Sequence, residues 1–469
     1  MDNVGVGTVT ASSKREADEI IARLERIPYA GFHRRLMALL GVGTFFDAYD
    51  TLAIAGALTM IFATLHISLA NAGLLGGIAY VGEFVGAILF GILSEVIGRK
   101  RAFLISLAFF GVLSLASAFS WNFQSLFWFR LLEGVGLGGE VPIAGAMFNE
   151  YVQGSNRGRR VLLYEALFPW GLFLTPLIGY ALISVAGPAL GWRLLFVIGF
   201  LPALWAIVGA FLMPESTRWL VDKGRISEAK RIVEGIEQSL PREGGQLPSA
   251  EVIVRADVKP TRFGELFSGA YRSRTALTWI LWFMTFFVTY GFQVWLPSLY
   301  VRVGHLPLSE SLLLTAATSA LSVIVAYVAA GIIDRAGRKP LFTWAFVLII
   351  LGALLGFVEV FAFHMTTWVA LLLAGIVMQV GYSVCSMSVY TYTPELYPTR
   401  MRGWGTAAAS SMSRAASFLA PVLVGLVLAD QGSIGPVFLM FAAAGLIGLI
   451  AILTLGIETK GRPLEDLSA

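Results

Sequence analysis

Gly91-Ile-Leu-Ser-Glu-Val-Ile-Gly-Arg-Lys100 is the stretch that decides the fold, because a related stretch occurs again later in the chain. The second copy, Ile333-Asp-Arg-Ala-Gly-Arg-Lys339, begins about 240 residues further on. Each copy closes a long apolar run and places an acid three residues before Gly-Arg-Lys. Two copies at this spacing predict a chain built from two related halves.

Other landmarks repeat in the same order. Glu150 is followed seven residues later by Arg157, and Glu395 is followed seven residues later by Arg402. Thr44-Phe-Phe with Tyr49 is echoed by Thr285-Phe-Phe with Tyr290, and Pro176 by Pro421. We therefore predict an N-terminal segment, a six-helix half, a linker, a second six-helix half and a tail, at 1–35, 36–213, 214–274, 275–457 and 458–469.

Composition places these halves in a membrane. Hydrophobic residues make up 57% of the 469 positions, 14% are charged, and the mean hydropathy is +0.75. A soluble protein of this length has about a quarter of its residues charged, and a spanning helix needs about 20 apolar residues. Twelve such runs occur, near 36–63, 71–93, 102–119, 124–148, 160–184, 193–213, 275–299, 309–333, 341–361, 367–391, 403–429 and 434–457. The prediction is an all-α membrane protein with twelve transmembrane helices in two pseudo-symmetric bundles.

The positive charges predict the orientation. Arginine and lysine gather in the loops after the second, fourth, eighth and tenth runs, whereas the opposite loops contain only Arg193 and Arg302. By the positive-inside rule both termini and the linker are cytoplasmic. The polar N-terminal segment has no signal-peptide pattern, and its residues Glu19 to Arg26 predict a short amphipathic helix on the cytoplasmic face. Four scattered histidines and one cysteine offer no metal-ligand spacing, so no metal and no cofactor are expected.

These motifs resemble the sugar-porter branch of the major facilitator superfamily over nearly the whole chain. The resemblance rests on the repeated Gly-Arg-Lys loops, Arg130 ahead of a glycine-rich helix, the Glu-x6-Arg loops, Pro214-Glu-Ser216 and Glu458-Thr-Lys-Gly461. Within that branch, three stretches resemble the bacterial niacin permeases: Arg23-Leu-Glu-Arg-Ile-Pro28 followed by Phe32-His33, then Phe46-Asp-Ala-Tyr-Asp50, and Ser413-Arg414. The chain departs from the family at Glu95-Val96, where a basic residue usually follows the acid.

The first group of candidate site residues is acidic and basic. Ionisable side chains at membrane depth usually face a partner or an aqueous path. Asp47 and Asp50 lie three residues apart, on nearly the same face of the first helix. The family pattern implies that Asp50 meets Arg130, with Glu133 one turn away, and such a pair can take up and release a proton. These four residues are predicted to couple protons to transport; the alternative is a permanent structural ion pair.

Arg414 is the second candidate. It lies deep in the eleventh run, where a guanidinium could hold a substrate carboxylate with two hydrogen bonds. The alternative is that Arg414 pairs with an acid of the protein, such as Glu165. Around it we expect aromatic and amide side chains to line a central cavity. The predicted substrate-binding set is Arg414, Phe45, Phe46, Tyr49, Tyr164, Trp170, Phe286, Phe287, Tyr290, Gln293, Gln379 and Tyr382, with Ser383 and Tyr390 as further candidates.

Two further patterns are interpreted structurally. Gly134-Val-Gly-Leu-Gly-Gly139 satisfies the dinucleotide pattern G-x-G-x-x-G, but it lies inside a membrane helix and indicates close helix packing. The charged loops predict a cytoplasmic gate of salt bridges between helix ends, although surface pairs can equally be solvated charges. The gate set is Glu95, Arg99, Glu150, Arg157, Asp334, Arg338, Glu395 and Arg402.

The expected function is proton-coupled uptake of a small aromatic monocarboxylate such as nicotinate by a monomer in a bacterial inner membrane. The substrate class follows from the resemblance and from Arg414. The alternatives are a sugar or organic-cation transporter of the same superfamily, and a non-transporting sensor on this scaffold. No nucleophile–base or metal constellation indicates an enzyme, and the net charge of +4 needs no nucleic-acid partner.

Overall fold

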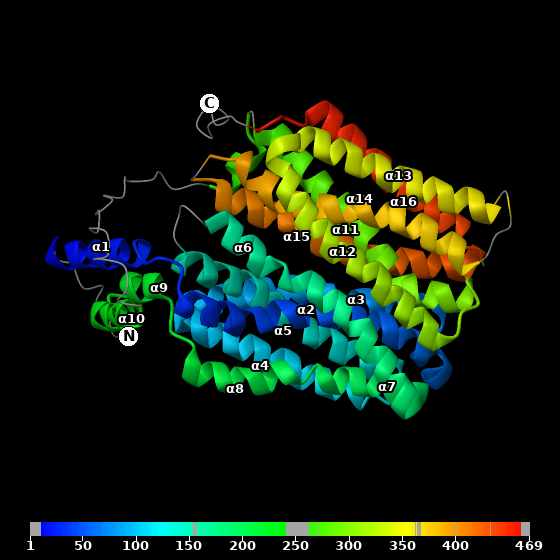
Figure 1. Ribbon diagram of the computed structural model, residues 1–469, viewed down its shortest axis with the longest axis horizontal. Coiled ribbons are helices and arrows are strands. Elements are labelled where there is room, and N and C mark those ends of the chain that lie inside the picture. Colours follow the sequence, from blue (N-terminus) through cyan, green and yellow to red (C-terminus); the bar gives the residue numbers. More distant parts are fainter. Residues whose placement is uncertain are drawn as a thin grey trace.

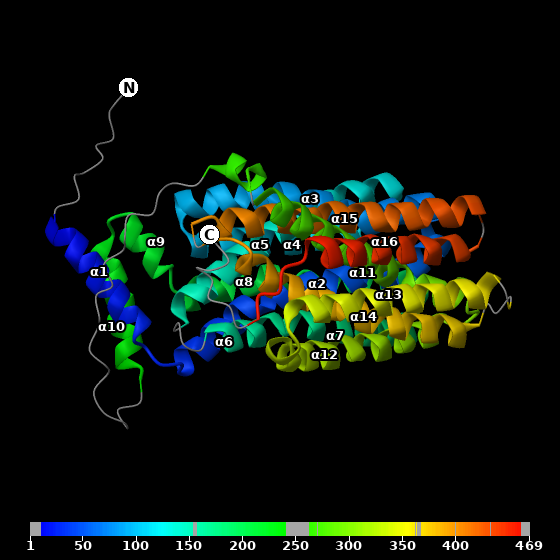
Figure 2. The ribbon, with the colours of Figure 1, turned by 90° about the horizontal axis from the view of Figure 1, so that it is seen from above.

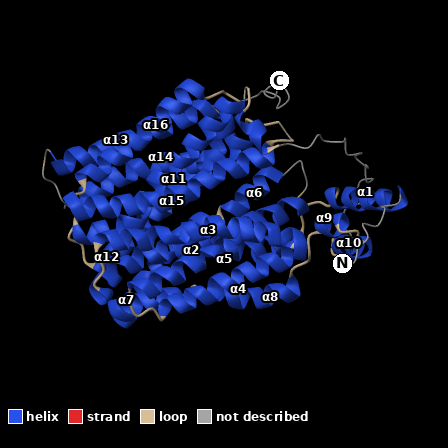
Figure 3. Ribbon diagram, turned by 180° about the vertical axis from the view of Figure 1, so that it is seen from behind, coloured by secondary structure: helices blue, strands red, loops and turns tan. Residues whose placement is uncertain are grey.

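The computed structural model describes residues 11–152, 157–240, 262–269, 271–361, 363, 367–398, 400–431 and 433–460. Within these ranges the chain is helical, with no strand (Figure 3). The long helices form two bundles that lie side by side (Figure 1). The first bundle comprises α2 (Gly31–Leu65), α3 (Leu69–Ile97), α4 (Arg99–Ala118), α5 (Phe123–Tyr151), α6 (Arg157–Glu165), α7 (Leu167–Ile198) and α8 (Leu201–Leu212). The second comprises α11 (Tyr271–Arg302), α12 (Leu308–Ala336), α13 (Arg338–Phe361), α14 (Trp368–Glu395), α15 (Arg402–Gln431) and α16 (Gly435–Leu455).

The segment Leu163–Leu212 crosses the membrane twice. Its 50 residues form one continuous apolar stretch, which would extend about 75 Å as a straight helix, more than twice the thickness of a bilayer core. Gly187, at φ +71°, reverses the direction of the chain inside α7. On either side of this turn, Tyr164 contacts Thr44 and Trp205 donates to the Leu39 carbonyl, both on α2. With this segment counted twice, the described residues contain the twelve predicted crossings.

Three short helices gather at one end of the molecule (Figure 2). They are α1 (Ala11–Glu25), α9 (Thr217–Asp222) and α10 (Ile226–Gln238), and a 3-10 turn, η2 (Phe263–Phe267), precedes α11. We call this end, which also carries the Arg99 and Arg338 loops, the basic end. The sequence predicted a shorter first helix, and α9 and α10 were not expected in the linker. The apolar spacing of Ala229, Val233 and Ile236 was the available signal, because these residues bury one face of α10.

The two bundles meet most closely in the half of the molecule that lies away from the basic end. A Cβ atom added at Gly73 or Gly77 of α3 would lie 2.6 Å from the Pro421 or Phe418 carbonyl oxygen of α15. The Arg302 guanidinium lies over the Phe62 ring at 3.9 Å, which joins the ends of α11 and α2. Small residues and a cation–π contact therefore hold the bundles together at the end opposite the basic end.

Candidate functional site

A cavity lies between the two bundles. It encloses about 1010 Å³ of space, counting the part open to solvent, and its wall combines aromatic side chains with a few polar and charged groups, as small-molecule sites do. Helices of both bundles contribute to its wall. The lining residues are Thr44, Asp47, Tyr80, Glu83, Val141, Glu165, Phe168, Pro169, Leu172, Phe286, Thr289, Tyr290, Gln293, Ser322, Ala326, Tyr382, Ser383, Ser386, Met387, Tyr390, Ser413, Arg414 and Ser417.

Arg414 of α15 faces Glu83 of α3 across this cavity. Its Nε atom lies 3.7 Å from Glu83 Oε2, and its Nη1 atom lies 3.3 Å from Ser413 Oγ. The first distance is that of an ion pair without a direct hydrogen bond. The Arg414 side chain is 19% exposed and that of Glu83 is 10% exposed. A permanently charged guanidinium therefore reaches the cavity with a loosely held partner from the other bundle.

Helix packing fixes the position of Glu83. A Cβ atom added at Gly138 of α5 would overlap the backbone of Glu83, and one added at Gly134 would overlap Ala79. These two helices touch because the glycines leave no side chain between them. The glycine-rich stretch of α5 thus acts as a packing surface, as the sequence indicated.

Aromatic rings form one wall of the cavity. Tyr80 of the first bundle lies 4.9 Å from Tyr290 of the second, between ring centroids, and Phe286 stacks on Tyr290 at 5.9 Å. Tyr390 packs at 4.7 Å against the buried Trp282. We call Tyr80, Phe286, Tyr290 and Tyr390 the aromatic wall. Flat rings at these separations provide faces on which an aromatic ligand can stack.

Acidic side chains outnumber basic ones around the cavity. Asp47, Glu83 and Glu165 line it, and Arg414 is the one cation among the lining residues. Glu140 of α5 lies behind this layer, and both of its carboxylate oxygens are buried without a hydrogen-bond partner in the described part of the chain. Unpaired buried charge is costly, so this set of acids has physical reason to bind protons.

Five members of the predicted substrate-binding set line the cavity: Arg414, Phe286, Tyr290, Gln293 and Tyr382. Ser383 and Tyr390, the further candidates, line it as well. Gln379 lies one layer behind and donates to the Thr318 carbonyl (2.5 Å) and to Ser322 Oγ (2.8 Å). It therefore supports a lining serine.

The other predicted aromatic residues lie elsewhere. Tyr49 donates to the Leu195 carbonyl inside the first bundle, where Phe46 packs against it. Tyr164 is buried on Phe148 and hydrogen-bonded to Thr44 Oγ1 at 2.5 Å. Three more residues complete the set. Phe45 packs on Phe46, Phe287 packs on Phe283 and Phe441 in the second bundle, and Trp170 is 41% exposed and stacks edge-on against Phe173.

The predicted proton-coupling residues separate into two places. Asp47 lines the cavity, whereas Asp50 turns into the first bundle and accepts two hydrogen bonds from Arg130. Glu133 also accepts from Arg130, at 3.0 Å, and from Ser117 at 3.3 Å. Asp50, Arg130 and Glu133 are all buried, and none of them lines the cavity. The expected Asp50–Arg130 pair therefore forms, and Asp47 lies outside this hydrogen-bonded cluster, at the cavity wall.

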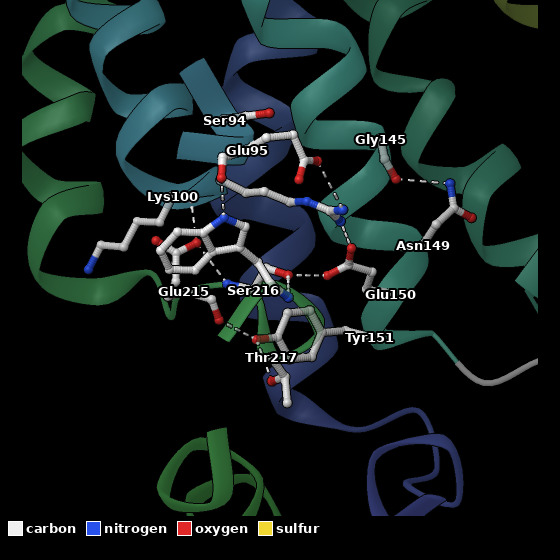
Figure 4. A network of polar contacts seen from close by, with 12 residues as sticks. Ser94, Glu95, Lys100, Gly145, Asn149, Glu150, Tyr151, Glu215, Ser216 and Thr217 are labelled. Atoms are coloured by element: carbon white, nitrogen blue, oxygen red, sulfur yellow. Dashed lines mark hydrogen bonds and ion pairs between the residues drawn. The ribbon is translucent and has the colours of Figure 1, made fainter. Parts of the chain in front are cut away.

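Charged residues at the basic end pair within each bundle. Arg99 forms an ion pair with Glu150, and Arg338 donates to Glu395 (Nη2–Oε1 2.7 Å). Ser216 also donates to Glu150, as Figure 4 shows, and Thr459 donates to Glu395 at 2.5 Å. The same arrangement thus occurs in both halves, and it joins helix ends of one bundle.

Two glutamates cap the helices that begin in these loops. Glu215 accepts from the Lys100 backbone N–H at 2.9 Å, and Glu458 accepts from the Arg338 and Lys339 N–H groups at 3.0 Å. These contacts satisfy free donors at the starts of α4 and α13. Burial raises the pKa of Glu458, but the backbone hydrogen bonds outweigh this and hold its pKa below the ordinary value.

The remaining gate candidates are less involved. Glu95 is exposed and lies 3.9 Å from Arg99, while its backbone carbonyl accepts from the Trp219 indole. Arg402 donates to the Pro394 carbonyl at 3.0 Å. The side chains of Arg157 and Asp334 lie outside the described part of the structure. A gating role for the whole set stays a prediction.

Sequence reasoning missed Tyr80, Glu83 and Glu140. Glu83 and Glu140 carried a usable signal, because each is an acid within a long apolar run, the same criterion that singled out Asp47 and Arg414. Tyr80 carried no usable sequence signal, because an uncharged tyrosine in a membrane helix does not stand out from the other tyrosines of the chain. The acid paired with Arg414 is Glu83, whereas Glu165 had been the suggested partner.

A model of the "Sugar (and other) transporter" family matches residues 36–469. The chain belongs to this family. The transporter is 32% identical over 467 residues to the niacin transporter NiaP of Acinetobacter baylyi, covering 96% of this chain and 99% of that protein. It is 30% identical to the putative niacin/nicotinamide transporter NiaP of Bacillus subtilis, covering 92% and 98%. A Xenopus laevis synaptic vesicle 2-related protein is 27% identical, with coverage of 95% and 82%.

Solved structures support the fold of the transporter. A D-xylose-proton symporter superposes with a TM-score of 0.73 at 19% identity, covering 92% of this chain and all of that one. The inward-open form of the Escherichia coli xylose transporter XylE also gives 0.73, with 93% and 99% covered. The transporter therefore has the two-bundle fold of the major facilitator superfamily and is a multi-pass membrane protein.

Proposed function

We propose that this transporter carries a small aromatic monocarboxylate such as nicotinate into the cell together with protons. The observation that carries the proposal is the position of Arg414, a guanidinium in the central cavity beside the aromatic wall. Arginine can hold a carboxylate through two hydrogen bonds, and the wall offers faces for the ring. The relatives at 32% and 30% identity, which are named as niacin and niacin/nicotinamide transporters, support niacin as the first compound to test.

The energy of such a contact set is consistent with useful affinity. An aromatic pair contributes about 0.5–1.5 kcal/mol beyond area burial, and a hydrogen bond to a charged group about 1.5–3 kcal/mol. Two stacked faces and a two-bond carboxylate anchor therefore supply several kcal/mol before apolar burial is counted. Micromolar binding corresponds to about 8.2 kcal/mol, so the burial of the apolar ring must offset the cost of immobilising the ligand for this affinity to be reached.

The wider setting is proposed on the same basis. We place both termini and the basic end in the cytoplasm of a bacterium. The arginine- and lysine-rich loops lie at the basic end, and such loops face the cytoplasm by the positive-inside rule. The protein acts as a monomer by alternating access between its two bundles. Asp50 and Glu133, both paired with Arg130, and Asp47 in the cavity are proposed to couple protons to transport.

Arg414→Ala tests the carboxylate anchor. We expect it to abolish saturable nicotinate uptake in proteoliposomes without lowering the yield of folded protein, and Arg414→Lys to restore uptake only in part. Lysine keeps the charge but lacks the planar two-bond geometry. Wild-type affinity in the alanine variant would refute the anchor.

Competing ligands test the substrate class on the wild-type protein. Nicotinamide has the same ring without the charge and should bind at least about tenfold more weakly, the equivalent of one lost charge-assisted bond. Benzoate should compete, and glucose should not. Among the described residues that line the cavity, Gln293 is the single side-chain amide, and glucose has no negative charge for Arg414 to bind. Strong glucose binding would favour a sugar transporter.

The excess of acids supports a second candidate. Asp47, Glu83 and Glu165 would suit an organic cation if all three remained ionised. A pyridinium cation such as 1-methylnicotinamide, methylated on the ring nitrogen, separates the candidates, because it keeps the ring and reverses the charge. Binding of this cation with greater affinity than nicotinate would transfer the proposal to organic cations.

A further inference from the structure

We propose that Glu83 is an internal competitor for Arg414, and that a proton on Glu83 releases the guanidinium to the substrate carboxylate. The proposal rests on the proposed function for the ligand class, an organic monocarboxylate. It assigns to Glu83 a proton-linked binding role that differs from proton carriage by the Asp50–Arg130 pair. That pair lies outside the cavity, whereas Glu83 and Arg414 both line it.

Glu83 and a substrate carboxylate would share one guanidinium group. Glu83 Oε2 lies 3.7 Å from Arg414 Nε, and Ser413 Oγ lies on the Nη1 side at 3.3 Å. A substrate carboxylate that binds with two hydrogen bonds must use an edge of the same guanidinium group. Because the Glu83 separation exceeds hydrogen-bond length, a ligand with two short bonds has the better geometry. Glu83 therefore neutralises Arg414 while the cavity holds no ligand. When a substrate anion binds, it replaces Glu83 as the partner of Arg414.

The surrounding charges make the proton necessary. Glu83 interacts with Asp47 and Asp50 from α2, with Arg130 and Glu140 from α5, and with Arg414 from α15. The polar hydroxyls near it are those of Tyr80 on its own helix and of Tyr290 and Tyr390 across the cavity. A substrate anion that entered beside an ionised Glu83 would place another negative charge against Arg414, the one cation among the described residues that line the cavity. One proton transferred from solvent to the Glu83 carboxylate keeps the local charge unchanged when one anion binds.

Thermodynamic linkage then sets the direction of the pH effect. If anion binding requires a proton on Glu83, substrate and proton each raise the affinity of the other by the same factor. Over the pH range in which Glu83 of the free protein is ionised, affinity for the anion should fall by about tenfold per pH unit as pH rises. Below that range the affinity levels off.

Isothermal titration of purified full-length protein with nicotinate, repeated across pH in two buffers of different ionisation enthalpy, measures both affinity and proton uptake. The wild type should show the tenfold slope and take up about one proton per ligand. Glu83→Gln should bind with an affinity that does not vary with pH, at least about tenfold tighter than wild type one pH unit into the sloping range, and without proton uptake. Glu83→Asp should restore the slope.

Glu165→Gln is the matched control, because Glu165 lines the same cavity but forms no ion pair with Arg414 in the described structure. It should keep the slope and the proton uptake even if the absolute affinity changes. An unchanged slope in Glu83→Gln, or a loss of slope in Glu165→Gln alone, would overturn the assignment to Glu83.

A measurement without ligand separates this inference from the proposed function. The thermal stabilities of Glu83→Gln, Arg414→Gln and the double variant form a double-mutant cycle, which detects whether the two residues interact. Pairing predicts that the effects are not additive, and additive effects would overturn the competition. If the cycle shows coupling while neither nicotinate nor benzoate binds, the proposed substrate fails and the internal pair stands.

Discussion

Two buried arginines in this transporter have different surroundings, and the difference suggests different roles. Arg130 donates to both oxygens of Asp50 and also to Glu133, so its charge is held by two acids of its own bundle. Arg414 has one acid at 3.7 Å, from the other bundle. The first arrangement is typical of a structural or proton-carrying pair, and the second leaves donors free for a ligand.

At the residue scale, Asp50→Asn is expected to abolish accumulation of substrate driven by a pH gradient while counterflow exchange continues. A neutral amide cannot carry a proton, but the cavity stays intact because Asp50 does not line it. Losing a buried charge partner can cost about 3–5 kcal/mol, although Glu133 remains beside Arg130, so the melting temperature should fall as well. The measurement is uptake into proteoliposomes with and without an imposed gradient.

Glu133→Gln provides the comparison, since it keeps the two bonds between Arg130 and Asp50. Nicotinate affinity should keep its pH dependence in Asp50→Asn, which distinguishes this site from Glu83. Undiminished accumulation in Asp50→Asn would show that Asp47 or Glu133, and not Asp50, carries the proton.

At the scale of helices, α1 is attached to α10 by charged hydrogen bonds. Arg23 donates to Glu237 through Nε (3.3 Å) and Nη2 (2.5 Å), and Arg26 donates through Nη2 (2.8 Å). Ile20 and Leu24 pack into the same apolar cluster as Val233 and Ile236. The N-terminal helix and the linker helix thus form one unit on the first bundle.

Removing the Glu237 charge should loosen α1. Burial raises the pKa of Glu237, but hydrogen bonds from Arg23 and then Arg26 outweigh it, and the pKa lies below its ordinary value. The stabilisation is therefore present above the ordinary glutamate pKa of about 4.3, and it is lost as pH falls through the lowered value. At pH 7, Glu237→Gln should speed hydrogen exchange in α1.

Glu234→Gln is the control on the same helix, because Glu234 is 43% exposed and lies 3.9 Å from Arg23. It should leave the exchange of α1 near that of wild type. The difference between wild type and Glu237→Gln should shrink as the wild-type carboxylate becomes protonated at low pH. Equal exchange in all three proteins at pH 7 would show that apolar packing alone holds α1.

At the scale of the whole molecule, the glycines of α3 set how closely the bundles approach at the end opposite the basic end. Gly77 lies against the backbone of Phe418, so Gly77→Leu must push α3 and α15 apart. Overpacking costs about 1–3 kcal/mol, enough to shift the population of this state by roughly fivefold to a hundredfold. The variant should favour a form that is open at that end and should transport more slowly.

A cysteine introduced at Thr289, a lining residue, reports the change through labelling by a membrane-impermeant thiol reagent. The experiment uses a Cys385→Ala background, since Cys385 is the chain's one cysteine. Labelling from the side opposite the basic end should increase in Gly77→Leu. It should not change in Gly91→Leu on the same helix, where a Cβ atom meets nothing within 4 Å.

Several features could be predicted from the sequence because they depend on local pattern. Apolar runs long enough to span a bilayer give the twelve crossings, since an unpaired backbone is too costly in lipid for any other structure to fill these runs. The repeated Gly-Arg-Lys loops indicated two halves. Arg414 stood out because a charge deep in an apolar run is costly without a function or a partner.

The tertiary structure decided which polar residues share the cavity. Asp47 and Asp50 are three positions apart, about 60° around a helix, and neighbouring helices turn one towards the cavity and the other towards Arg130. Glu83 reaches Arg414 although 331 positions separate them in the sequence (414 − 83). Helical periodicity fixes which residues share a face, but the direction of that face depends on how all the helices pack together. That packing is a property of the assembled bundles, which no single segment of sequence contains.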